Sequence, residues 1–82
     1  MLVSVRYFAG AAAAAGTEEE KVRLAAGATV ADLVGHLVEQ HPRLSPVFEV
    51  ASLLLDEVAV RDRGVVVPDG ATVDVLPPFA GG

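Results

Sequence analysis

Cysteine and tryptophan are absent from this 82-residue chain, which has only two histidines, His36 and His41. Without cysteine the chain can form neither a disulfide nor a thiolate zinc site, so any sulfur chemistry must use a group other than a side-chain thiol. Two histidines are too few for an obvious metal or catalytic cluster, and we expect no bound metal. A cysteine-free composition suits a reducing compartment, so we expect a cytoplasmic protein.

Cations and long apolar runs are also scarce. Six Lys and Arg stand against eleven Asp and Glu, which gives a formal net charge of −5. So acidic a domain lacks the basic surface that nucleic acids bind, and it favours protein partners with a basic face. The apolar stretch at residues 8–15 is far shorter than the roughly 20 residues that span a bilayer. We therefore expect one small domain that binds neither nucleic acid nor membrane.

The spacing of the apolar residues predicts several strands and one main helix. Alternation indicates strands, whereas apolar residues at i, i+3 and i+4 indicate the helix. Residues 43–51 follow neither period, and we expect an irregular segment there with a short turn at 46–48. The predicted elements are a strand at 2–8, a helical turn at 11–15, a strand at 18–24, a helix at 29–41, short strands at 52–55 and 58–60, and a last strand at 72–76.

The order of these elements predicts the fold. Thr29 is a good N-cap with Asp32 in the capping-box position, and Pro42 ends the helix. The helix supplies the crossover that lets the first and last strands pair in parallel. This is the plan of an α+β, β-grasp (ubiquitin-like) domain over residues 1–76, a mixed sheet with one main amphipathic helix packed on one face. An extended tail follows at 77–82.

The tail points most directly to a function. Pro77 and Pro78 end the last strand, because proline has no N–H to donate to a sheet. The six tail residues can reach up to about 20 Å, and Gly81 and Gly82 carry no side chain, so they fit a narrow channel. We expect the tail to deliver the carboxylate of Gly82 to a partner.

A partner-binding surface is expected at the base of the tail. Phe8 and Leu76 fall on the outward faces of neighbouring strands, and Phe79 follows soon after, so the three predict an exposed apolar patch of the kind that marks partner sites. The alternative is that Phe8 packs under residues 11–15 and Phe79 folds back on the domain. The predicted partner-binding residues are Phe8, Leu76, Pro77, Pro78, Phe79 and Ala80.

Several short motifs, taken in order, resemble those of a known family. They are Tyr7-Phe8-Ala9, Gly16-Thr17, Thr29-Val30-Ala31-Asp32-Leu33, Asp69-Gly70 and the Pro-Pro-x-x-Gly-Gly ending. In these motifs the chain resembles, over essentially its whole length, the small subunits of molybdopterin synthase, which are ubiquitin-like sulfur carriers. The chain departs from that pattern at Asp56-Glu57, where the family often has Asn-Gly.

The resemblance implies a sulfur-transfer cycle. A ubiquitin-activating-type enzyme adenylates the carboxylate of Gly82 with ATP, and a sulfur donor protein converts it to a thiocarboxylate. The large synthase subunit, in a heterotetramer, accepts the tail, and the sulfur passes to a pterin precursor of the molybdenum cofactor. The resemblance thus makes Gly81 and Gly82 the reactive end of a sulfur-donating, non-catalytic subunit. This subunit binds no cofactor itself, since the ATP is used by the activating enzyme.

Other interpretations of the tail stay open. Carriers for thiamine thiazole, tRNA thiolation or cysteine synthesis share the fold and the Gly-Gly ending. A ubiquitin-like protein modifier would use the same adenylate to join Gly82 to lysines of its targets. In a non-covalent interaction module the tail would be inert.

Overall fold

The computed structural model describes residues 1–78; the predicted site residues Phe79, Ala80, Gly81 and Gly82 lie outside the described residues. The chain forms a mixed sheet with its main helix packed on one face, which confirms the predicted β-grasp fold class. The elements are β1 (Leu2–Tyr7), α1 (Gly10–Ala15), β2 (Glu19–Arg23), α2 (Val30–Gln40), the 3-10 turn η1 (Pro42–Leu44), α3 (Ser45–Val50), β3 (Ser52–Leu55), β4 (Val58–Ala59) and β5 (Thr72–Leu76).

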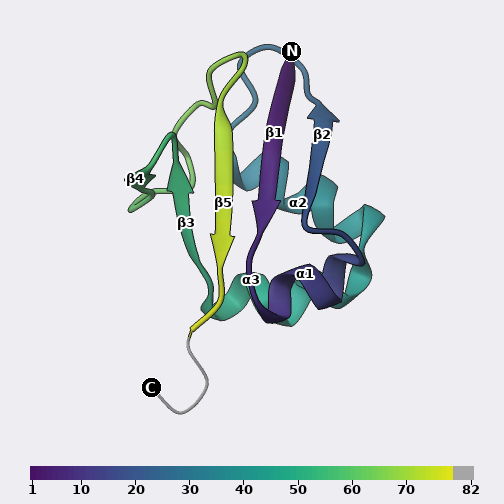
Figure 1. Ribbon diagram of the computed structural model, residues 1–82. Coiled ribbons are helices and arrows are strands. Elements are labelled where there is room, and N and C mark those ends of the chain that lie inside the picture. Colours follow the sequence, from purple (N-terminus) through teal and green to yellow (C-terminus); the bar gives the residue numbers. More distant parts are fainter. Residues whose placement is uncertain (79–82) are drawn as a thin grey trace.

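The five strands lie in the order β2-β1-β5-β3-β4 (Figure 1). Strand β1 pairs antiparallel with β2 and, as predicted, parallel with β5. Parallel strands point the same way, so β1 and β5 end at the same edge of the sheet. The chain therefore leaves β5 towards Pro77 beside the segment that leaves β1 at Phe8.

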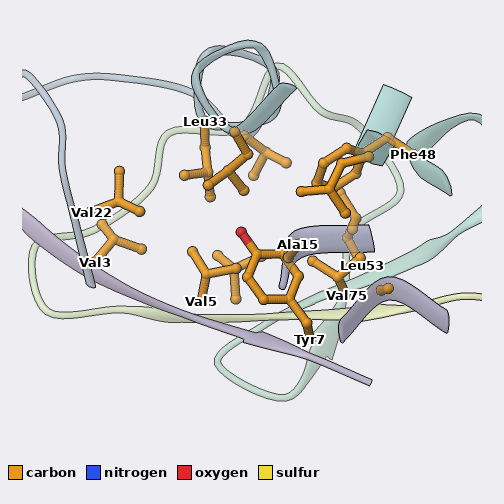
Figure 2. Close-up of a cluster of buried hydrophobic side chains, with 14 of the residues drawn as sticks. Val3, Val5, Tyr7, Ala15, Val22, Leu33, Phe48, Leu53 and Val75 are labelled. Atoms are coloured by element: carbon orange, nitrogen blue, oxygen red, sulfur yellow. The ribbon is translucent and has the colours of Figure 1, made fainter. Parts of the chain in front are cut away.

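The hydrophobic core fills the space between the sheet and the helices. Alternate residues of β1 and β5 supply one side of it, and the apolar stripe of α2 supplies the other (Figure 2). The intervening residues of both strands lie on the opposite face, which carries no helix within residues 1–78. The side chains buried most completely are Val3, Val5, Val30, Leu33, Leu37, Leu44, Val67, Val73 and Val75.

The predicted boundaries of the main helix are confirmed. The Asp32 N–H donates to Thr29 Oγ1 at 3.2 Å, and the Thr29 N–H donates to Asp32 Oδ2 at 2.9 Å. This capping box satisfies two backbone donors that have no partner inside the helix. The helix ends at Gln40, with His41 as its C-cap directly before Pro42. No helix within residues 1–78 combines the length and the apolarity that crossing a bilayer requires.

The prediction of an irregular segment at 43–51 is wrong. Most of it is helical, in η1 and α3. Leu44 is fully buried and Phe48 is 3% exposed, so the core fixes these short helical turns. A helix of about six residues is too short to be stable alone or to show a clear period, because nucleation is costly.

Candidate functional site

The base of the tail is a partly apolar corner of the sheet. The Phe8 N–H donates to the Val75 carbonyl at 3.1 Å, which extends the β1–β5 pairing by one residue beyond β1. Phe8 is 40% exposed, so it is not packed away under the alanine segment. Leu76 and Pro77 are half-buried, and Pro78 is exposed. The structure thus brings Phe8 together with the start of the tail, as the sequence predicts, and their partner-binding role stays a prediction.

A strained turn follows Phe8. Ala9 has φ 50° and ψ −128°, a conformation that favours glycine. The Ala11 N–H donates to the Phe8 carbonyl at 3.0 Å and closes the turn. The chain therefore reverses directly after Phe8 into α1, and this reversal leaves the Phe8 ring at the corner.

An ion pair lies next to Phe8 on the uncovered face of the sheet. Arg6 and Asp74 are cross-strand partners, and they bond through Nε to Oδ1 at 2.6 Å and Nη2 to Oδ2 at 2.8 Å. The Asp74 side chain is 6% exposed and that of Arg6 is 42% exposed. The guanidinium lies 5.9 Å from the centroid of the Phe8 ring. The hydrogen bond to Asp74, and then its charge, raise the pKa of Arg6.

The Arg6–Asp74 pair was not predicted, although the sequence contains a signal for it. Arg6 alternates with the inward residues of β1, and Asp74 alternates with those of β5. Because both residues alternate with inward residues, and their strands are predicted to be parallel neighbours, their opposite charges fall on the same outward face of the sheet. The register that sets them opposite each other depends on the tertiary structure.

An acidic depression of about 420 Å³ adjoins the ion pair. Its rim carries more carboxylates than cations, and Glu57 and Glu19 contribute to the raised pKa of Arg6. This face suits a polar or basic contact better than an apolar ligand. The residues that line it are Ser4, Arg6, Glu19, Asp56, Glu57 and Thr72.

A second polar cluster lies on the helix side of the sheet. Tyr7 Oη donates to Glu20 Oε2 at 2.9 Å, and His41 Nε2 lies 2.7 Å from the same oxygen. Burial, and then the bond to Glu20, raise the pKa of Tyr7. The contacts of Glu20 with Tyr7 and His41 tie the end of α2 to β1 and β2, which indicates a structural role.

Within residues 1–78, no group of three His, Cys, Asp or Glu is placed to hold a metal ion. The corner around Phe8 can serve as a docking surface, since it places exposed apolar and polar side chains beside the start of the tail. The predicted reactive residues Gly81 and Gly82 lie outside the described part of the chain.

Comparisons with known proteins agree with this fold. The sequence profile of the ThiS family matches residues 5–82. No curated protein matches the chain. Among solved structures, SAMP1 (small archaeal modifier protein 1) from Haloferax volcanii is 28% identical, with a TM-score of 0.90 and 100% of both chains covered.

Two further solved structures are similar. A Pyrococcus furiosus protein designated molybdopterin converting factor, subunit 1, is 27% identical, with a TM-score of 0.87 over 96% of this chain and 99% of that one. A chain of the complex between subunits 1 and 2 of molybdopterin-converting factor from Helicobacter pylori is 21% identical, with a TM-score of 0.74 and 100% of both chains covered. This last likeness shows the fold alone.

Proposed function

The chain belongs to the ThiS family of ubiquitin-like sulfur carriers, and from that premise we propose that it carries sulfur as a thiocarboxylate on Gly82 and donates it in molybdopterin synthesis. The observation that carries this proposal is the extent of the family match, which includes both the folded domain and the Gly-Gly residues. The likeness to molybdopterin converting factor, subunit 1, supports the choice of the pterin pathway.

Two reactions would load the carrier. A carboxylate oxygen of Gly82 attacks the α-phosphorus of ATP, and pyrophosphate leaves. Hydrosulfide then attacks the acyl carbon of the adenylate, and AMP leaves. The first step converts a carboxylate oxygen into part of a good leaving group, AMP, and the second step uses that leaving group, so the energy for the sulfur-for-oxygen exchange comes from ATP. An adenylating enzyme performs the chemistry, and this chain supplies the substrate carboxylate.

Delivery of the sulfur would require a second partner, and we propose the large subunit of a molybdopterin synthase. A thiocarboxylate sulfur is nucleophilic and hydrolysable, so the accepting site must exclude water. Residues without side chains can enter such a site, while the folded domain provides the binding energy that orients the tail. A complex of subunits 1 and 2 of molybdopterin-converting factor from Helicobacter pylori supports a partner of this kind.

Intact-mass spectrometry tests the proposal. The chain is incubated with an adenylating enzyme encoded in the same genome, ATP and sulfide. We expect a mass increase of one sulfur-for-oxygen exchange, which fragmentation places on Gly82. The exchange should be absent without ATP, and absent when one bulky residue is appended after Gly82. An unchanged wild-type mass with the cognate enzyme would contradict the proposal.

The second candidate is a protein modifier, which the high structural likeness to SAMP1 favours. In that case the adenylated Gly82 would be joined to lysine amines of target proteins. Conjugates would then survive denaturing gels and disappear when Gly81 and Gly82 are deleted. Under the carrier proposal, the thiocarboxylate instead converts a pterin precursor in the presence of the large subunit, with no stable conjugate.

A further inference from the structure

The Arg6–Asp74 pair is poorly explained as a device for fold stability. The Asp74 side chain lies on the face of the sheet that no described helix covers, yet it is buried there. Its negative charge therefore needs a cationic partner, which Arg6 supplies. Only Asp74 of the pair is buried, and a buried charge that is paired is often no more stable than a well-packed apolar side chain in the same place, because it loses hydration. The flanking core-side residues are all uncharged, Val5 and Tyr7 in β1 and Val73 and Val75 in β5. The pair therefore calls for a role other than packing.

Its geometry leaves donors available. A guanidinium has five N–H groups in a planar fork. Two of the guanidinium nitrogens of Arg6 donate hydrogen bonds, and within residues 1–78 both go to the Asp74 carboxylate. The Arg6 side chain remains 42% exposed and lies beside the exposed Phe8 ring. The remaining N–H groups thus lie on the surface next to the base of the tail, in an orientation that the bidentate bond holds fixed.

We propose that Arg6 is a partner-contacting residue, which donates hydrogen bonds to neutral carbonyl oxygens of the adenylating enzyme that docks on the Phe8–Leu76 corner, and that Asp74 is its positioning residue. This inference rests on the proposed function, because it assumes that a partner covers this corner to reach Gly82. Asp74 neutralises the guanidinium in advance, so an apolar partner surface can cover it without burying an unpaired charge.

The surroundings of Arg6 select the acceptor. Glu19 and Glu57 act electrostatically on Arg6, and both line the adjoining depression. A partner carboxylate placed here would be repelled by these acids, whereas a main-chain or amide carbonyl would not. The occupant is therefore a partner segment with an apolar side chain against Phe8 and a carbonyl group against Arg6.

The test compares adenylation kinetics of the full chain with the cognate adenylating enzyme. The variant Arg6→Met/Asp74→Leu removes the donors and keeps the net charge. We expect KM for the carrier to rise about tenfold with kcat unchanged, because docking and not chemistry is lost. The thermal midpoint should not fall. The variant Arg6→Lys, which keeps the charge but not the planar fork, should give an intermediate KM with the fold intact.

The matched control is Arg23→Met/Glu39→Leu, which removes one cation and one acid at exposed positions, Arg23 opposite Leu2 at the start of β1 and Glu39 on α2. Its KM should equal that of the wild type. Wild-type KM in both Arg6 variants would overturn the inference while the proposed function stands. A wild-type chain that is not adenylated at all would remove both.

Salt concentration tests the choice of acceptor. A bond to a neutral carbonyl is only weakly screened, so the KM ratio of variant to wild type should hold from about 0.05 to about 0.5 M salt. If this KM ratio instead fell towards 1 at high salt, the acceptor would be a partner carboxylate. That result would overturn the assignment of a neutral acceptor.

Discussion

At the scale of single residues, Ala9 shows where the chain accepts strain beside the candidate docking corner. Its φ of 50° with ψ of −128° is a conformation that a residue with a Cβ rarely adopts. The strain costs on the order of 1–3 kcal/mol and persists only where the surroundings enforce it. Here β1 ends and α1 begins within two residues, so the turn must form at this position.

Replacement of Ala9 by glycine should therefore stabilise the protein. We expect Ala9→Gly to raise the free energy of unfolding by about 1 kcal/mol, since relief of the strained φ exceeds the entropy cost of glycine. Chemical denaturation measures the change. Ala13→Gly is the matched control, because Ala13 lies exposed inside α1 and its replacement should lower stability by about 0.5–1 kcal/mol. Destabilisation by Ala9→Gly would contradict the strained conformation.

At the scale of elements, the Tyr7–Glu20–His41 cluster joins two strands to the end of the main helix. Burial and the Glu20 carboxylate disfavour the charged phenolate, so the pKa of Tyr7 is raised in the folded state. A raised folded pKa contributes stability that is fully present below the unfolded pKa of about 10 and is lost as pH rises above it. The cluster should therefore hold at neutral pH and fail in strong alkali.

This is testable because Tyr7 is the chain's single tyrosine. The free energy of unfolding should fall as pH rises above about 10, the reference value for tyrosine, and phenolate absorbance should appear together with unfolding. Tyr7→Phe should lack that tyrosine-dependent part of the alkaline slope. A phenolate that forms with the reference pKa in the folded protein would contradict the buried, hydrogen-bonded placement.

The elements also show which parts of the structure could be predicted. Alternation in β1 and the apolar stripe of α2 reveal their own periods, and Thr29 with Asp32 marks a helix start by local hydrogen bonding. Helix α3 could not be predicted, because its six residues are held by the burial of Phe48 and not by a periodic pattern. The Arg6–Asp74 contact joins residues 68 positions apart, and only the sheet register sets it.

At the scale of the whole molecule, the Phe8 corner and the β4 edge of the sheet differ in what they offer a partner. The corner at Phe8 lies where β1 and β5 both end, beside the acidic depression and the start of the tail. The edge strand β4 also exposes an apolar side chain, since Val58 is 68% exposed. Exposure of an apolar residue alone therefore does not identify the docking surface; its position relative to the tail does.

This difference gives a prediction with an internal control. Phe8→Ala should raise KM for adenylation about tenfold, as expected for a central aromatic contact, with little change in thermal midpoint because the ring is already 40% exposed. Val58→Ala removes a more exposed apolar side chain at β4 and should leave KM unchanged. If Val58→Ala raised KM while Phe8→Ala did not, the partner would dock on the β4 edge. The tail, which follows β5, would then start two strands away from the docking surface.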